Sequence, residues 1–289
     1  MVVQHNLTAM NSNRMLGATQ LAQAKSTEKL SSGYKINRAA DDAAGLAISE
    51  KMRRQIRGLT QATANAQDGI SAVQTAEGAL NEVHDMLQRM NELAIKAGNE
   101  TLQTVDKSYI QSEMTALQTE INRVAETTTF NEQKLLNGDF TGTDGNGKKI
   151  QVGSEVASAN QISVKINKMD WGTISATDLT TNTNATTATL DVTTSYDTLK
   201  ATVSTIKNAM QNVSTQRSDL GAVQNRLEHT VSNLKNVVEN TTAAESAIRD
   251  TDMASEMVKF ANNNILTQAG QAMLAQANQS NQGVLALLA

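Results

Sequence analysis

The sequence of 289 residues contains no cysteine and no proline. Without cysteine the chain forms no disulfide and offers no thiolate for metal binding or nucleophilic catalysis. At an average usage of about 5%, a chain of this length would carry roughly fourteen prolines. Because proline removes a backbone hydrogen-bond donor and kinks helices, its absence favours long uninterrupted helices.

Aromatic residues and histidines are also scarce. One tryptophan, three tyrosines and three phenylalanines are too few to build the ring-rich core of an average enzyme. The three histidines, His5, His84 and His229, lie far apart in the sequence and provide little for metal binding or acid–base chemistry. We therefore expect a mainly α-helical, elongated protein that is not an enzyme and holds no cofactor and no metal.

Charge and hydropathy argue against two further classes of function. The net charge of -4 gives no broad basic field for nucleic acid. The sequence has no run of 18 apolar residues, so we expect no membrane insertion, and its first thirty residues lack the layout of a secretory signal peptide. Residues 1–60 carry a net charge of +5 and residues 239–289 a net charge of -3, which favours pairing between the two ends.

A heptad series in the first third of the chain predicts a long coiled-coil helix over residues 43–98. Apolar residues occupy every seventh position from Met52 to Ala94, and a second apolar row, from Ala76 to Ala97, is offset from the first by three. The seam residues that we expect to be buried in this helix are Leu59, Val73, Leu80 and Leu87.

A second heptad series predicts another long helix over residues 197–248. Its main row begins at Leu199, and a companion row four positions later begins at Val203 and includes Arg217 and Gln224. The nearly equal lengths of the two helices suggest that they pair side by side. The seam residues expected here are Leu220, Leu227 and Leu234.

A third helix is predicted over about residues 104–128, where apolar residues alternate at spacings of four and three after a turn at Gly98. It is expected to fold back along the first long helix. Because two antiparallel neighbours and a long return helix pack laterally, the pattern predicts an antiparallel helical bundle or coiled coil.

Residues 131–196 show a different pattern. Asn-Gly pairs mark turns, and two short alternating segments, residues 150–152 and 162–166, predict a small β-hairpin region followed by a threonine-rich loop. Because this insert separates the two long helices in the sequence, we expect it to cap one end of the bundle.

Both ends of the chain contain apolar residues but no charged ones. No charged side chain occurs in residues 1–13 or 260–289, and Asn and Gln interrupt the second segment too often for a membrane span. Since a solvated helix carries charges on its outer face, we expect both termini to be buried against other chains. The candidate assembly residues are Leu7, Ile265, Leu266, Met273, Val284, Leu285, Leu287 and Leu288.

Motifs for ligand chemistry fail on inspection. Residues 142–149 read GTDGNGKK, but Lys149 stands where a phosphate-binding loop needs Ser or Thr, and a strand rather than a helix is expected to follow. Asp144 and Asn146 resemble the start of a calcium loop that no glutamate closes. His84 has no second histidine at helical spacing, so we interpret it as a solvated helical residue.

Longer strings carry a clear resemblance. Residues 30–52 read LSSGYKINRAADDAAGLAISEKM, residues 58–94 read GLTQATANAQDGISAVQTAEGALNEVHDMLQRMNELA, and residues 217–252 read RSDLGAVQNRLEHTVSNLKNVVENTTAAESAIRDTD. Over roughly residues 1–140 and 195–289 the chain resembles bacterial flagellin. The resemblance implies a structural subunit that polymerises into the flagellar filament for swimming motility.

The same resemblance implies a division of the chain. Residues 1–42 and 250–289 would be the segments whose helices pack in the filament core. Residues 43–196, including the insert at about 131–196, and residues 197–249 would form the rod domain. The centre is too short for the large variable outer domains of longer flagellins.

Partners and localisation follow from the resemblance in the same way. It implies a homopolymer, an open helical filament outside the cell, and export through the flagellum's own secretion channel without a cleaved signal peptide. An export chaperone and the hook-associated and cap proteins are the implied partners. The flagellin-sensing Toll-like receptor of animal hosts is a further implied partner, and its recognition residues carry over to Gln88, Arg89, Leu93 and Glu113, with Asn91 in place of a frequent arginine.

Two alternatives remain open at this point. A flagellar hook–filament junction protein would share both terminal regions, although the unbroken SDLGAVQNRL segment and the short centre favour the filament subunit. A coiled-coil signalling protein of the chemoreceptor type would also pair long helices, but it would place a tight helical hairpin at the tip instead of a threonine-rich β insert.

Overall fold

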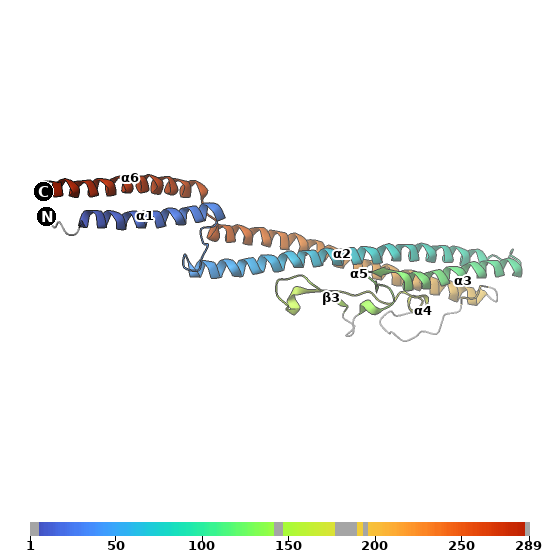
Figure 1. The fold of residues 1–289 in the computed structure, drawn as a ribbon. Helices are drawn as coiled ribbons and strands as arrows, with labels where there is room; N and C mark the ends of the chain where they lie inside the picture. Colours follow the sequence, from blue (N-terminus) through green and yellow to red (C-terminus); the bar gives the residue numbers. More distant parts are fainter. Residues whose placement is uncertain (1–5, 142–146, 177–189, 193–195, 287–289) are drawn as a thin grey trace. The chain divides into compact units, whose positions relative to one another are not determined.

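The structure, a computed structural model, describes residues 6–141, 147–176, 190–192 and 196–286, with side chains described up to residue 279. These residues are mainly helical, with two short two-stranded antiparallel sheets (Figure 1). The predicted mainly α fold with a small β region is therefore confirmed. By its internal contacts the chain divides into two compact units: unit 1 comprises residues 1–56 and 239–289, and unit 2 comprises residues 57–238.

The two long helices are α2, Ala43–Ala97, and α5, Tyr196–Arg249. Each end lies within one residue of the boundary that the heptad series predicts. A third helix, α3, Thr104–Thr127, follows a turn in which the Gly98 amide donates to the carbonyls of Ala94 and Ile95. The helical part of the sequence prediction is therefore confirmed almost residue by residue.

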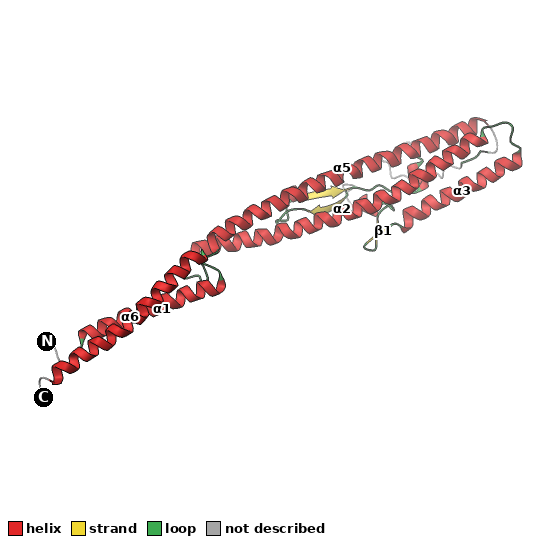
Figure 2. Ribbon diagram, turned by 90° about the horizontal axis from the view of Figure 1, so that it is seen from above, coloured by secondary structure: helices red, strands yellow, loops and turns green. Residues whose placement is uncertain are grey.

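In unit 2, α2, α3 and α5 share one apolar core. Leu80 of α2, Met114 of α3 and Ile206 of α5 are fully buried in it, together with Leu135 and Trp171 of the insert. Figure 2 shows α2, α3 and α5 running alongside one another in unit 2. Burial of so many large apolar side chains within a single cluster provides the main stabilisation of this unit.

The insert lies along the side of the bundle, so the expectation that it caps one end is wrong. The Asn65 side chain on α2 donates to the Gln151 carbonyl at 3.2 Å, and the Trp171 amide donates to Asn122 of α3 at 2.8 Å. Ile150 approaches α2 so closely that a β-carbon at Gly69 would clash with it. The insert carries large apolar side chains of its own, and only the flank of the bundle offers enough apolar surface to bury them.

Within the described residues, the insert and the segment just before it form two hairpins. β3, Lys148–Gln151, pairs antiparallel with β4, Gln161–Val164, with Ile150 opposite Ile162, as the alternating segments predict. The other hairpin, β1, Thr129–Phe130, with β2, Gln133–Lys134, turns through Asn131 and Glu132, both at positive φ. The sequence pattern does not predict this second hairpin, because its turn has no glycine.

Three short helical turns complete unit 2. They are η1, Asp139–Thr141, η2, Ser158–Asn160, and α4, Trp171–Ile174. The Asp170 side chain caps α4 by accepting from the Thr173 amide at 3.3 Å. Most of the predicted threonine-rich loop lies outside the described residues.

In unit 1, α1, Leu7–Ser32, lies beside α6, Met253–Ala286 (Figures 1 and 2). Asn6 caps α1 by accepting from the Ala9 amide at 3.0 Å, and Gly33 ends it in the left-handed conformation. The Asp252 side chain caps α6 by accepting from the Ala254 amide at 3.0 Å. Backbone bonds from Thr251 to Gly33 and from Lys35 to Arg249 hold the two helix ends together.

Candidate assembly and recognition surfaces

The helix pair α1–α6 exposes apolar side chains. Of the candidate assembly residues, Leu7, Ile265, Leu266 and Met273 are each more than half exposed. Six further exposed apolar residues on the same two helices are Met10, Met15, Leu21, Met253, Met257 and Val258. The side chains of Val284 and Leu285, and residues Leu287 and Leu288, lie outside the described part of the structure.

The contact between α1 and α6 is mostly polar. The Ser26 hydroxyl donates to the buried Glu256 carboxylate at 2.7 Å, and Thr267 donates to Gln23 at 3.3 Å. Among the described side chains of these two helices, Ala277 is the only buried apolar one. The fully buried side chains of this pair are therefore mainly polar, and most of its large apolar side chains are exposed.

A groove of about 310 Å³ opens between the two helices. Its walls include Met15 and Leu16 of α1 and Leu266, Gly270 and Met273 of α6. Gly270 permits the close approach, since a β-carbon there would stand 3.2 Å from Leu16. The groove extends the exposed apolar surface into the contact between α1 and α6. A partner that binds over the exposed apolar side chains therefore also covers the groove.

Glu256 is held ionised inside this contact. The hydrogen bond from Ser26 lowers the pKa of Glu256, with help from Lys259 at 3.3 Å and from the charge of Lys29, while burial acts in the opposite direction. A shift of α6 along α1 would break the hydrogen bond from Ser26 and move Glu256 away from Lys29, while Lys259 on α6 would move with it. The contact therefore favours one helix register, because burying the carboxylate without its hydrogen bond is costly.

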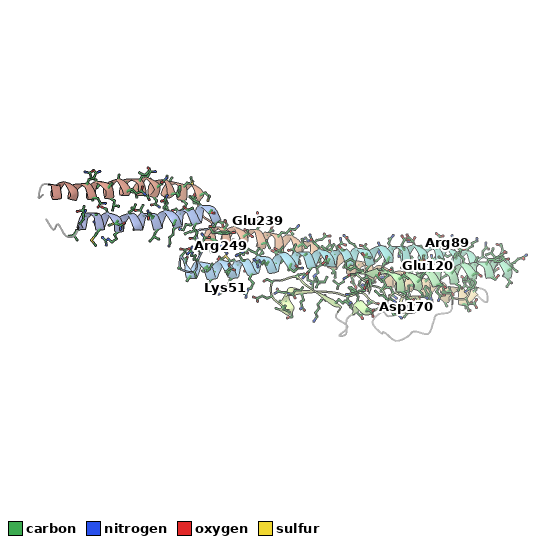
Figure 3. All side chains as sticks on the ribbon, viewed as in Figure 1. Lys51, Arg89, Glu120, Asp170, Glu239 and Arg249 are labelled. Carbon is green, nitrogen blue, oxygen red and sulfur yellow. The ribbon has the colours of Figure 1, made fainter. Side chains whose placement is uncertain are left out.

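The candidate recognition residues lie where α2 and α3 run side by side. Arg89 of α2 forms an ion pair with Glu113 of α3 at 2.9 Å and a second one with Glu92 at 3.2 Å. Figure 3 labels Arg89 on α2 and Glu120 on α3. The hydrogen bond that Arg89 donates to the Glu113 carboxylate is the largest cause of a raised Arg89 pKa. Two residues 24 positions apart in the sequence thus form one charged, half-exposed cluster.

The other two recognition candidates differ in their placement. Gln88 is exposed and lies 2.9 Å from the His84 ring. Leu93 is only 2% exposed and belongs to the core of unit 2, so it offers no side chain to a partner at this surface. Leu93 shares the helix with Arg89, but it packs beneath the charged cluster rather than beside it.

All seven seam residues, Leu59, Val73, Leu80, Leu87, Leu220, Leu227 and Leu234, are buried. The companion row on α5 is only partly the one expected. Over residues 202–216 the buried members are Thr202, Ala209 and Gln216, which follow the main row by three positions, whereas Arg217 and Gln224 are only partly buried. Of the expected row, Val231 is buried, and Val203 and Met210 are partly buried against the core. Arg217 instead lies 3.7 Å from Glu77 of α2.

Gln216 is a residue that sequence reasoning missed. Only 1% exposed, it donates to the Lys165 carbonyl at 3.0 Å and accepts from the Asn167 amide at 3.3 Å. It thereby attaches the insert to α5. The buried pair Ser26–Glu256 was missed for the same reason: a polar residue at a buried position interrupts no apolar pattern that would reveal it.

Features for ligand chemistry are lacking in the part of the chain that is described. No cluster of three metal-ligating side chains occurs there, and no described helix is long and apolar enough to cross a membrane. Lys148 and Lys149, the end of the possible phosphate loop, belong to β3, and residues 142–146, which include Asp144 and Asn146, lie outside the described residues.

Comparison with known proteins agrees at both ends of the chain. The model of the bacterial flagellin N-terminal helical region matches residues 3–141, and that of the C-terminal helical region matches residues 203–288. A flagellin from Halalkalibacterium halodurans is 51% identical over 292 residues, and one from Bacillus subtilis is 49% identical over 310 residues; both alignments cover 100% of each chain.

A solved structure supports the fold. The putative flagellar hook-associated protein from Vibrio parahaemolyticus matches with a TM-score of 0.60 at 14% identity, covering 73% of this chain and 100% of that one. At this identity the likeness shows a shared fold alone.

Proposed function

The chain belongs to the bacterial flagellin family, the structural subunits of the flagellar filament, and we propose that its copies polymerise through the exposed apolar surface of α1 and α6. Full-length relatives that are about half identical carry the name flagellin. The hook–filament junction and chemoreceptor alternatives gain no support, because the hook-associated structure shares only the fold.

The observation that carries this proposal is the exposure of large apolar side chains on the helix pair. Leu7, Ile265, Leu266 and Met273 face solvent, and residues 260–289 contain no charge that would keep such a surface soluble. Large apolar side chains left exposed together on one pair of helices indicate a protein–protein interaction site. In an open helical polymer one face of each copy meets a different face of the next, so the exposed sides of α1 and α6 serve as two complementary faces.

The test introduces charge into this surface. Leu266→Lys combined with Met273→Lys changes two side chains that are exposed in the monomer, so the monomer stays soluble. We expect it to fail to elongate filament seeds. The matched control is Thr215→Lys, an exposed position of α5, which should elongate normally. Normal growth of the double variant would contradict the assignment.

Export and assembly partners complete the proposal. The filament lies outside the cell, and the chain travels through the flagellum's own secretion channel without removal of a signal peptide. An export chaperone covers the apolar termini beforehand, and the hook-associated and cap proteins direct assembly. The chain acts as a structural element and has no enzymatic activity. Mass spectrometry of the secreted subunit tests the export route: loss of an N-terminal peptide during secretion would contradict it.

Recognition by the flagellin-sensing Toll-like receptor of animal hosts is proposed at Arg89, Glu113 and Gln88, with Leu93 acting from beneath by packing. The supporting observation is that Arg89 and Glu113 form one exposed ion-paired cluster. Arginines are enriched among interface residues that dominate affinity. Arg89→Ala should weaken receptor binding by more than about 1 kcal/mol. Arg123→Ala, which removes a similar exposed ion pair with Glu120, is the control and should leave binding unchanged; equal binding by all three proteins would exclude Arg89 from the site.

A further inference from the structure

Exposed apolar side chains of unit 2 fall into two places. Ile95, Val105, Tyr109 and Tyr196 lie where α2 ends and where α3 and α5 begin. Among the described residues of unit 2, the one other large apolar side chain that is exposed is Val156, which is 90% exposed on the connection between β3 and β4. The exposed side chain of Val156 and the separate apolar area at the helix ends suggest the two halves of one contact between copies.

The segment that carries Val156 is held rigidly. The Gln151 side chain donates to the carbonyls of Gly153 and Glu155 at 3.1 and 2.6 Å, and the Asn160 side chain donates to the Glu155 carbonyl at 2.9 Å. These bonds fix the tip, residues 155–157, before any partner is present. A fixed tip loses little conformational entropy on binding.

The second place contains a groove of about 470 Å³, here called the Ile95 groove. Its walls are formed by Ala94, Ile95 and Gly98 of α2 and by Tyr196, Leu199 and Val203 of α5. Its volume exceeds that of one valine side chain, so it accommodates the tip with its neighbours.

The charged side chains next to Val156 and those that line the Ile95 groove are opposite in sign. Lys200 and Lys207 line the Ile95 groove, and within the described residues neither of them forms an ion pair. Glu155 is exposed next to Val156. Opposite charges beside complementary apolar surfaces favour one orientation of approach and disfavour others.

One chain cannot make this contact with itself. Ser154, next to the tip, packs against Gly58 of α2, whereas the groove lies beside Gly98 of the same helix. Forty residues of helix separate these points by about 60 Å. The tip of one copy therefore reaches only the groove of another.

We propose that Val156 of one copy inserts into the Ile95 groove of the next copy, with Glu155 facing Lys200 and Lys207. This contact is heterologous and does not close on itself, so it extends a polymer. It rests on the proposed function, because it assumes that the chain polymerises, but it uses a surface of unit 2 that is separate from α1 and α6.

Cross-linking tests the contact directly. Because the chain has no cysteine, a variant with Val156→Cys and Ser204→Cys, which lies in the groove wall, forms disulfides only between these positions. In filaments grown on seeds and oxidised, we expect a ladder of covalent oligomers on a gel without reductant. The control pairs Val156→Cys with Ser214→Cys, about 15 Å further along α5, and should give no ladder. Absence of a ladder in filaments of the first variant, or equal ladders in both, would overturn the contact.

Charge reversal provides a second readout. Glu155→Lys alone, or Lys200→Glu with Lys207→Glu, should raise the critical concentration for filament growth roughly fivefold, the scale of one exposed charge contact. Combining all three changes should restore growth towards that of the parent, while the control Glu126→Lys, on an exposed face of α3, should have no effect. Failure of the combined variant to recover would overturn the pairing. Failure of the parent protein to polymerise would instead overturn the proposed function, so the two failures are distinguishable.

Discussion

Unit 2 and the helix pair α1–α6 of unit 1 distribute the same kinds of residue in opposite ways. In unit 2, Leu80, Met114 and Trp171 are fully buried, so the bundle completes its own core. In the helix pair, Ser26 and Glu256 are buried, while Leu266 and other apolar residues face solvent. Helix formation and core formation are therefore separate in this chain. Unit 2 completes its own apolar core, whereas α1–α6 provides one part of a core that other copies complete.

The largest expected difference between the two regions concerns leucine truncation. Leu80→Ala should lower the free energy of unfolding of the monomer by about 2–5 kcal/mol, through lost apolar burial and the cavity left behind. Leu266→Ala, at an exposed position, should change it by less than about 0.5 kcal/mol. Denaturant unfolding followed by circular dichroism measures both, and similar losses for the two variants would show that α6 already buries Leu266 in the monomer.

A smaller effect is expected where the insert is attached to α5. Gln216→Leu leaves the Lys165 carbonyl and the Asn167 amide without their partner, and unsatisfied groups of this kind cost about 1–3 kcal/mol each. Gln224→Leu is the matched control, because Gln224 bonds only to Glu228 near the surface and should change stability by less than about 0.5 kcal/mol. If Gln224→Leu instead lowered the melting temperature more than Gln216→Leu, the row that contains Gln224 would be the buried one in this part of α5.

Within unit 1, we expect the polar contact between Ser26 and Glu256 to stabilise the helix pair more than any single apolar contact does. Ser26→Ala removes the hydrogen bond to the buried Glu256 carboxylate and should lower the free energy of local opening of α1 and α6 by about 1–2 kcal/mol. Ser31→Ala, an exposed serine on the same helix, should leave hydrogen exchange unchanged. If both variants exchanged amide hydrogens at the same rate, contacts with lysine alone would be enough to stabilise the buried Glu256 carboxylate.

The smallest effect is a pH dependence of the same contact. The pKa of Glu256 is lowered from its ordinary value of 4.5, so the stabilisation is fully present above about pH 4.5 and is lost as the pH falls through the folded-state pKa. Asp41 and Glu50 of unit 1 also have lowered pKa values. The hydrogen-exchange rate of α1 and α6, measured as the pH is lowered, should therefore depend less steeply on pH in Glu256→Gln than in the parent protein. Some pH dependence should remain. An unchanged titration curve would remove Glu256 from the contact.

The helices could be predicted because their heptad rows continue over many turns. Ala43 and Ala97 bound α2 within one residue of expectation, and the hairpin around Ile150 and Ile162 was visible in its alternation. Long repeating patterns average out local ambiguity, which explains this agreement.

The remaining features depend on contacts that leave no periodic signal. Gln216 is buried because carbonyl and amide groups some fifty residues earlier meet it, and the lateral position of the insert depends on Trp171 reaching Asn122. For the candidate sites, uncharged termini indicated the assembly surface, whereas the placement of Leu93 in the core required the packing of α3 against α2.

Hydrogen exchange compared between monomer and filament separates the two regions of the molecule. Amides around Leu80 should be strongly protected in both states, because unit 2 completes its own core. Amides around Leu266 should exchange rapidly in the monomer and become protected by orders of magnitude in the filament, because their apolar side chains find partners only there. Equal and strong protection around Leu266 in the monomer would contradict the claim that α1–α6 depends on neighbouring copies.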